Sequence, residues 1–316
     1  MRNIGLSCFK DFFCLAGACP DTCCSGWQVD LDENAVEAYN ALPGELGNEI
    51  RQRLLKTETG CTFRMDGKRC PFLNEDNLCR LILAQGDGIL STTCREHPRF
   101  WEEYKDIRET ALSISCPEAA RLLFTGDLRL IEEDSSEVLP DCDYDEELFS
   151  LLWEVRNDYM TLLQGNTPFS TVCEELLAEG KAIQQQCDLW FSLEPGKEYT
   201  GSIQGFLRHL ETMYVTDHRL PEKLKKAKWD DTLLNKSPAP AKRLLYYFLY
   251  RYLLTAVWDG MVLEKVLFCL YSVYAIYALA EDESDLLPAA ILYSREVEHS
   301  PENLAGIFAF LYVKAL

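Results

Sequence analysis

The chain has 316 residues, of which 47% are hydrophobic and 26% are charged, so it can bury a sizeable core. This composition excludes a disordered or low-complexity chain, and the length suggests one large domain or two modest ones. The formal net charge of −20 argues against nucleic acids and anionic membranes as partners.

The N-terminus lacks the features of a signal peptide. Lys10 and Asp11 interrupt the apolar residues, so only residues 12–18 remain as a hydrophobic segment, which is too short. Ala16-Gly17-Ala18-Cys19 resembles a lipoprotein cleavage site, but no hydrophobic segment of proper length precedes it. We therefore predict a cytoplasmic protein, in a compartment where disulfides are rare.

Short elements are expected in the first part of the chain. Residues 30–56 carry helical signals, with Asp32 as an N-cap and Pro43-Gly44 dividing the segment into two helices. Residues 62–70 are typical of a β-hairpin whose turn is Asp66-Gly67. Pro117 is suited to the first position of a helix. We predict that residues 1–126 form a cysteine-rich, metal- or cluster-binding region.

The second part of the chain is predicted to be helical. Nine of the sixteen residues from 132 to 147 are acidic, so we interpret residues 127–145 as a solvated linker, with an acidic metal site as the alternative. A helical domain is expected over residues 146–316. Its helices are predicted at 146–164, 170–190, 201–214, 240–258, 261–280 and 285–299, with a last one capped by Ser300 and begun by Pro301. The fold class is therefore mainly α.

Two strongly apolar runs lie between residues 244 and 280. Arg251 interrupts the first run, and the uncharged part of the second, residues 266–280, is shorter than the roughly 20 residues that span a membrane. We interpret both runs as buried helices and predict no membrane association.

Cysteine is concentrated near the N-terminus, where ten of the fourteen cysteines lie in the first 116 residues. Eight of them are grouped in a way that indicates a thiolate metal site: Cys14, Cys19, Cys23, Cys24, Cys70, Cys79, Cys94 and Cys116. Adjacent cysteines such as Cys23 and Cys24 point in different directions and are hard to explain by packing. The isolated ones are interpreted as core or linker residues: Cys142, Cys173, Cys187 and Cys269.

The spacing of the cysteines indicates which metal they could bind. Zinc is commonly held by Cys-x2-Cys pairs, which this sequence lacks, whereas iron–sulfur clusters accept more varied spacing. The pattern favours an iron–sulfur cluster, with zinc as the alternative.

Several blocks of the sequence resemble the flagellin lysine-N-methylase family. The cysteine blocks, with Gly26-Trp27 and Cys70-Pro71-Phe72-Leu73, are also similar to a broader group of cysteine-rich zinc- or iron-chelating proteins. Residues 113–121 (SISCPEAAR) and residues 294–299 (SREVEH) are similar to the methylases themselves. The resemblance implies a methyltransferase that transfers methyl from S-adenosylmethionine to lysine side chains of flagellin and carries a cysteine-bound [4Fe-4S] cluster.

The residues themselves leave the mechanism open. The sequence lacks the glycine-rich fingerprint of Rossmann-type methyltransferases and the Cys-x3-Cys-x2-Cys triplet of radical S-adenosylmethionine chemistry. Candidate catalytic residues are Glu298, His299 and Asp32, and candidate cofactor-binding residues are Arg99, Glu118, Arg121 and Arg295. For each there is a structural alternative, such as capping by Asp32 or ion pairing by Arg99. Two non-enzymatic functions also remain: a metal-chelating module and an interaction scaffold stapled by zinc.

Overall fold

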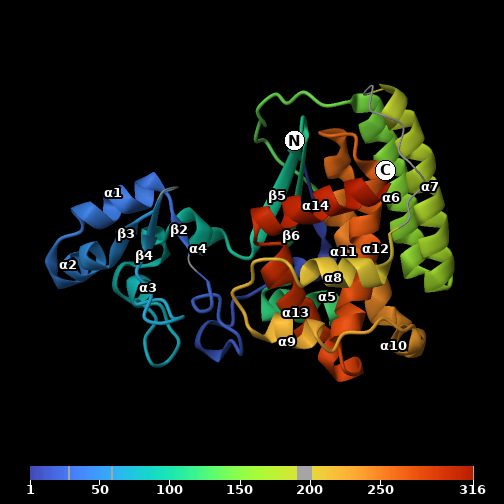
Figure 1. Ribbon diagram of the computed structural model, residues 1–316. Coiled ribbons are helices and arrows are strands. Elements are labelled where there is room, and N and C mark those ends of the chain that lie inside the picture. Colours follow the sequence, from blue (N-terminus) through green and yellow to red (C-terminus); the bar gives the residue numbers. More distant parts are fainter. Residues whose placement is uncertain (28, 58–59, 191–200, 316) are drawn as a thin grey trace.

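The computed structural model describes residues 1–27, 29–57, 60–190 and 201–315. Helices dominate these residues and short strands form two small sheets, which confirms the mainly α class. A small lobe contains α1 to α4 and β2 to β4, and a large lobe contains the helices from α5 onward together with the second sheet (Figure 1). Each lobe has its own core of buried apolar side chains.

The small lobe combines a short sheet with several helices. Its elements are β2 (Asp30–Leu31), α1 (Glu33–Ala41), α2 (Gly44–Arg53), β3 (Leu54–Lys56), β4 (Cys61–Phe63), α3 (Arg80–Gln85) and α4 (Thr92–Glu96). The Asp32 carboxylate accepts a hydrogen bond from the Ala35 N–H at 3.0 Å, which confirms the predicted N-cap. Helix α2 begins at Gly44, whose φ of +80° suits glycine, so the predicted break at Pro43-Gly44 is also confirmed.

Of the hairpin predicted at residues 62–70, only the turn around Gly67 is formed. Asp66 and Arg69 exchange backbone hydrogen bonds of 2.9 and 3.1 Å around Gly67, but no ladder continues beyond them. Strand β4 pairs instead with β3 and β2. The second arm of the expected hairpin bonds elsewhere, because the Cys70 N–H donates to the Cys24 carbonyl at 2.9 Å. The prediction of a hairpin partner for this strand was therefore wrong.

The sheet of the large lobe was not predicted. It has the order β5-β6-β1-β7, where β1 is parallel to β6 and antiparallel to β7. The strands are β1 (Arg2–Leu6), β5 (Arg99–Tyr104), β6 (Ile107–Leu112) and β7 (Leu130–Asp134). Strand β7 lies within the segment interpreted as a linker, so that part of the segment is paired with the sheet.

A buried ion pair joins this sheet to the helices. The Arg156 guanidinium on α6 is fully buried and donates to both carboxylate oxygens of Glu109 on β6, at 2.8 and 2.5 Å. Arg156 also donates to the Tyr250 carbonyl on α11 at 3.2 Å. Because Glu109 faces the core, the strand lacks the simple alternation of apolar and polar residues from which a strand is predicted.

The remaining elements of the large lobe are helices. They are α5 (Pro117–Thr125), α6 (Glu146–Gln164), α7 (Phe169–Trp190), α8 (Ile203–Leu210), α9 (Arg219–Leu224), α10 (Thr232–Lys236), α11 (Pro238–Tyr252), α12 (Val262–Leu279), α13 (Leu286–Val297) and α14 (Pro301–Ala315). The predicted starts at Pro117 and Pro301 are confirmed, and the Ser300 hydroxyl accepts from the Asn303 N–H at 3.2 Å as the expected cap. Helices α9 and α10 were not predicted.

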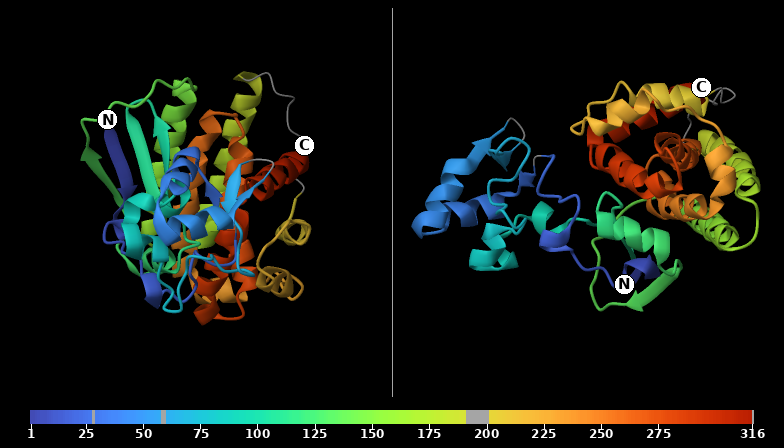
Figure 2. Two further views of the ribbon diagram at one scale, coloured as in Figure 1. Left: turned by 90° about the vertical axis from the view of Figure 1, so that its left-hand side faces the viewer. Right: turned by 90° about the horizontal axis from the view of Figure 1, so that it is seen from below.

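Helix α12 lies at the centre of the large lobe. The view from below shows other helices on all its sides (Figure 2). It is long and apolar enough to cross a membrane by length and composition, but 89% of it is buried inside the fold. The interpretation of this apolar run as a buried helix is therefore confirmed. Cys269 on α12, like Cys173 and Cys187 on α7, is buried in the core, as predicted.

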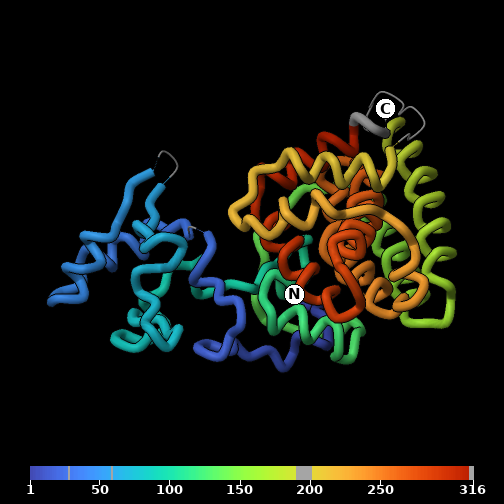
Figure 3. Tube along the Cα trace, turned by 60° about the horizontal axis from the view of Figure 1, so that its bottom comes forward, coloured from blue at the N-terminus to red at the C-terminus, as the bar shows by residue number. Residues whose placement is uncertain are grey.

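The chain crosses between the lobes twice (Figure 3). The first crossing follows the short helix at Ser7–Phe9 and carries the cysteines from Cys14 to Cys24, and the second joins α4 to β5. The core of the large lobe includes Ile4 and Leu6 of β1 as well as residues of β6 and α5. The two cores thus divide the chain at the crossings, and the sequence-based division at residues 126 and 145 stays a prediction.

Candidate active site

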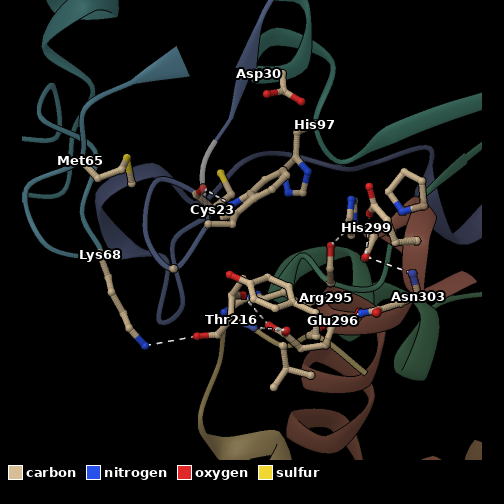
Figure 4. Close-up of a pocket in the computed structure, with 18 of the residues that line it drawn as sticks. Cys23, Asp30, Met65, Lys68, His97, Thr216, Arg295, Glu296, His299 and Asn303 are labelled. Atoms are coloured by element: carbon tan, nitrogen blue, oxygen red, sulfur yellow. Dashed lines mark hydrogen bonds between the residues drawn. The ribbon is translucent and has the colours of Figure 1, made fainter. Parts of the chain in front are cut away.

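A cavity of about 640 Å³ lies where the two lobes meet (Figure 4). Its lining on the side of the small lobe and the first crossing is Cys23, Gly26, Trp27, Asp30, Met65, Gly67, Lys68 and His97. Its lining on the large lobe is Ser115, Tyr214, Val215, Thr216, Arg295, Glu296, His299, Ser300, Pro301, Glu302 and Asn303. The cavity therefore draws on both chain crossings and on the end of α13.

Three rings form an aromatic cluster on the wall of this cavity. The ring centroids of Trp27, His97 and His299 are 5.5 to 5.6 Å from one another. The indole N–H of Trp27 donates to the Cys23 carbonyl at 2.6 Å, which holds the indole beside the cysteine segment. A wall of this kind offers ring faces to a cation or an apolar group.

Both imidazoles of this wall are neutral at physiological pH. Burial lowers the pKa of His97 to about 4, with a smaller contribution from the charge of Arg295. The pKa of His299 is lowered to about 3, mainly by burial, with smaller contributions from His97, Arg251 and Arg295. A neutral imidazole both donates and accepts hydrogen bonds, so these rings can contact a cation without repelling it.

Two serines fix the ring of His299. Its Nε2 lies 2.8 Å from the Ser113 hydroxyl and 2.7 Å from the Ser115 hydroxyl. Both serines lie between β6 and α5, whereas His299 follows α13, and the Ser113 hydroxyl also lies 3.3 Å from that of Ser294. Since a hydroxyl can donate or accept, these contacts suit either tautomer of the imidazole.

Charged groups join the first crossing to the large lobe at Arg295, a residue of the cavity lining. The Asp21 carboxylate forms ion pairs with Arg295 at 3.0 Å and with Arg219 at 3.1 Å. Arg219 also pairs with Asp217 at 2.5 Å. The Arg295 side chain is only 11% exposed, and its positive charge still acts on the cavity wall, where it lowers the pKa of His97 and His299.

The segment from Tyr214 to Asp217 is fixed as one wall of the cavity. The buried Glu296 carboxylate accepts from the Thr216 N–H at 2.7 Å and the Thr216 hydroxyl at 2.8 Å. Asn303 donates to the Tyr214 carbonyl at 2.8 Å. From the small lobe, the Lys68 ammonium donates to the Thr216 carbonyl at 3.3 Å, which joins the two lobes through residues of the cavity lining (Figure 4).

Four of the grouped cysteines gather beside the cavity, and we call Cys14, Cys19, Cys23 and Cys116 the cavity group. Burial raises the pKa of the Cys116 thiol, and the thiols of Cys19 and Cys14 raise it further. A hydrogen bond with Cys24, followed by burial, raises the pKa of Cys23, and Cys14 and Cys116 add to that rise. The four thiols are thus near enough to act on one another, and Cys23 also lines the cavity.

The other four grouped cysteines lie in or beside the small lobe, and we call Cys24, Cys70, Cys79 and Cys94 the small-lobe group. Burial raises the pKa of Cys70, Cys79 and Cys94, and the Cys24 sulfur raises each of them further. As the side chains are placed, no three His, Cys, Asp or Glu residues within the described ranges are close enough to hold a metal ion. Binding of a metal by either group would require its thiols to turn toward a common point.

Comparisons with known proteins place the chain in a family. The sequence is 35% identical over 133 residues to the flagellar biosynthetic protein FliU of Salmonella muenchen, a match that covers 40% of this chain and 79% of FliU. The chain belongs to the family of FliU and the lysine-N-methylases. It is 35% identical over 130 residues to the lysine-N-methylases of Salmonella typhimurium and Salmonella choleraesuis. That match covers 39% of this chain but only 32% of either methylase, and no family model and no solved structure matches significantly.

Two of the predicted polar site residues line the cavity. They are His299 and Arg295. Glu298, next to His299, instead points into the core, where its carboxylate accepts from the Tyr252 hydroxyl at 2.9 Å and pairs with Arg251 at 3.0 Å. At the end of α13, the adjacent side chains of Glu298 and His299 thus lie in the core and in the cavity wall, respectively.

The other predicted polar residues lie outside the cavity lining. Asp32 caps α1 and also accepts from the Thr92 N–H at 2.7 Å. The Arg99 guanidinium lies over the ring of Phe12, 5.5 Å from its centroid. On α5, Glu118 and Arg121 pair with each other at 2.6 Å. These residues hold the fold of the segments around the cavity, and none of them faces its interior.

Sequence reasoning missed several residues of the site. Trp27 and Ser113 lie in blocks that resemble the methylases, but the sequence offered no reason to assign them a role. His97 carried a stronger signal, because the chain has only four histidines and two of them meet at this cavity. Glu296 could not be found, since its role is to hold Thr216, which lies 80 positions earlier in the chain.

Proposed function

We propose that this chain is a protein-lysine N-methyltransferase that modifies flagellin in the cytoplasm, using S-adenosylmethionine as the methyl donor. The names of its relatives support lysine methylation and a flagellar context. The cavity between the lobes supports a site for the donor and the lysine, because its volume of about 640 Å³ is within the range of ligand sites.

The aromatic cluster is the observation that carries this proposal. S-adenosylmethionine supplies a methyl group on a positively charged sulfonium, which a neutral lysine amine displaces. The face of Trp27 attracts a cation, and the neutral rings of His97 and His299 permit one to approach. This wall therefore suits both the charged donor and a methylated ammonium product.

The chain's own groups favour a neutral substrate amine. A lysine side chain with a usual pKa of about 10.4 loses its proton more readily when it is buried near a positive charge. Arg295 at the edge of the lining supplies such a charge. With its low pKa, His299 acts as a hydrogen-bond acceptor that orients the amine, whose proton passes to solvent. Ser113 and Ser115 position that imidazole.

We assign the [4Fe-4S] cluster to the cavity group. A [4Fe-4S] cluster takes four cysteine thiolates, and this group supplies four thiols close to the cavity. Three of these sulfurs accept a hydrogen bond from the backbone N–H two positions later in the chain: Cys14 from Ala16 at 3.4 Å, Cys19 from Asp21, and Cys116 from Glu118. Such hydrogen bonds favour the thiolate form that a cluster needs. When bound, the cluster would supply a redox-active iron centre beside the wall that Cys23 lines.

Methyl transfer from labelled S-adenosylmethionine to purified flagellin tests this function. His299→Gln removes an imidazole from the cavity and is expected to abolish most transfer, whereas His218→Gln removes an exposed imidazole outside the lining and should not. Equal activity of the two variants would overturn the placement of the site. Absence of transfer by the wild type to a matched flagellin would overturn the function and favour a metal-chelating module or a zinc-stapled scaffold.

A further inference from the structure

We propose that the large lobe binds the phosphate group of a small organic molecule in a second cavity, between the end of α6 and the start of α11. This second cavity has a volume of about 650 Å³, and the connection from α5 to β7 forms its third wall. Among the described residues, none lines both cavities. The inference therefore goes beyond the proposed function and requires neither a metal nor methyl transfer.

The lining of the second cavity is positively charged, although the chain as a whole is acidic. Its charged side chains are one carboxylate, Asp127, and three cations, Arg129, Lys242 and Arg243, which leaves a net charge of +2. Asp127 pairs with Arg129 at 2.7 Å, so the excess charge belongs to Lys242 and Arg243. In a chain with a formal charge of −20, this local excess of positive charge favours an anionic ligand.

Arg243 is held in place by only part of its guanidinium. Its Nε donates to the Leu123 carbonyl at 2.6 Å, and its Nη2 donates to the Gly126 carbonyl. The guanidinium has five N–H donors, and among the described residues the other three have no partner. Burial lowers the pKa of Arg243, and the nearby Cys8 and Asp127 offset only part of that effect. An anion in the cavity would supply the charged partner that this partly desolvated cation lacks within the described chain.

Lys242, the preceding residue of α11, is bonded to the end of α6. Its ammonium donates to the Gly165 carbonyl at 2.8 Å and forms no ion pair in the part of the chain that the structure describes. Beside it, the Gln164 amide donates to the Leu128 carbonyl, which joins α6 to the connection from α5 to β7. These contacts hold the walls and both cations together without a ligand, so binding requires little ordering of side chains.

The size and the apolar part of the lining indicate an organic phosphate and not a bare ion. A volume of about 650 Å³ is within the range of sites for small molecules. Leu163 and Tyr246 are buried apolar side chains of the lining, and Pro238 and Ala239 add apolar surface. A guanidinium binds phosphate through paired hydrogen bonds, and an ammonium binds it as a point charge. A phosphate group with a charge of about −1.5 to −2 matches the net charge of the lining.

Calorimetric titration of the full chain with phenyl phosphate, inorganic phosphate and phenol, in a phosphate-free buffer of low salt, tests the ligand class. We expect phenyl phosphate to bind more tightly than inorganic phosphate, because its ring contacts the apolar lining, and we expect phenol not to bind. Equal affinity of the two phosphates would overturn the organic ligand in favour of free phosphate. Absence of binding by both phosphates, or binding of phenol as tight as that of phenyl phosphate, would overturn the site.

Variants locate the binding in the second cavity. Lys242→Gln and Arg243→Gln should each weaken the binding of phenyl phosphate by about tenfold or more, because each removes a hydrogen bond to a charged group. Lys226→Gln removes an exposed ammonium outside the lining and is the matched control, which should bind like the wild type. Unchanged binding in the first two variants, or an equal loss in all three, would overturn the proposal.

A measurement on the wild type covers the case in which Arg243→Gln fails to fold. Acetic anhydride acetylates accessible lysines, and mass spectrometry of peptides gives the rate at each position. An excess of phenyl phosphate should slow the acetylation of Lys242 and leave that of Lys226 unchanged, and an unchanged rate at Lys242 would overturn the proposal. Failure of methyl transfer or absence of a cluster would leave these readouts unaffected, so the two proposals are tested separately.

Discussion

The Nε2 atom of His299 lies 2.8 Å from the hydroxyl of Ser113, although the two residues are 186 positions apart in the sequence. This contact joins the end of α13 to the connection between β6 and α5. Both residues lie in blocks that resemble the lysine methylases, and the fold brings these blocks together at one cavity.

Removing both serine hydroxyls should impair methyl transfer without unfolding the protein. Ser113→Ala with Ser115→Ala leaves His299 without the two contacts that hold its ring, and a loss of orientation of this kind can cost about 10²-fold in rate. Steady-state kinetics with flagellin measure this effect. Ser150→Ala, on the exposed face of α6, is the matched control and should retain full activity. Full activity in the double variant would show that the contacts do not position a reacting group.

The stability of the protein should fall as the pH drops from 7 to 5. In the folded protein the pKa values of His97 and His299 are lowered from 6.5 to about 4 and about 3, mainly by burial. The unfolded chain therefore binds more protons than the folded chain below pH about 6.5, which lowers the free energy of unfolding by at most about 1.4 kcal/mol per pH unit for each imidazole. Urea unfolding at several pH values measures this slope.

The variant His97→Asn separates this effect from the titration of carboxylates. It removes one of the two imidazoles whose protonation is suppressed in the folded protein. The stability of the variant should therefore depend less steeply on pH between 7 and 5 than that of the wild type. An unchanged slope would mean that His97 is protonated as readily in the folded protein as in the unfolded chain.

Breaking the buried ion pair should destabilise the large lobe strongly. In Glu109→Gln the fully buried Arg156 loses its charged partner, which is expected to cost about 3–5 kcal/mol in the free energy of unfolding. Lys10→Gln breaks an exposed pair with Glu133 and should cost less than about 1 kcal/mol. Chemical denaturation measures both values, and equal losses would contradict the burial of the pair.

Salt should weaken the use of basic substrates. The net charge of −20 attracts positively charged segments, and this long-range attraction is screened when the Debye length falls from about 10 Å at 0.1 M salt to about 3 Å at 1 M. We expect KM for a lysine-rich flagellin peptide to rise with salt while kcat changes little. A peptide without excess charge is the control, and an equal rise in its KM would exclude electrostatic attraction.

Local sequence signals predicted the helices well because caps and apolar periodicity are properties of neighbouring residues. Helix α6 has the predicted bounds, and the caps Asp32 and Ser300 act as expected. The strands were missed where tertiary contacts override the pattern, as at Glu109, which faces the core because Arg156 meets it there.

The candidate site could be predicted only in part, because it too depends on contacts between residues far apart in the sequence. The assignment of eight cysteines as metal ligands stays a prediction, and the sequence did not indicate which of them lie near Cys23 and which near Cys24, whose thiols share a hydrogen bond. Glu298 and His299 were predicted together, whereas the end of α13 separates them. Sequence position alone does not specify on which side of a helix end a side chain is buried.

The most direct test of the proposed activity is mass spectrometry of tryptic flagellin peptides after incubation with the anaerobically purified protein and S-adenosylmethionine that carries a deuterated methyl group. We predict deuterated methyl groups on lysine side chains, with none in reactions of the His299→Gln variant. Unlabelled lysines in the presence of the folded wild-type protein, with the proposed cluster reconstituted, would contradict the account.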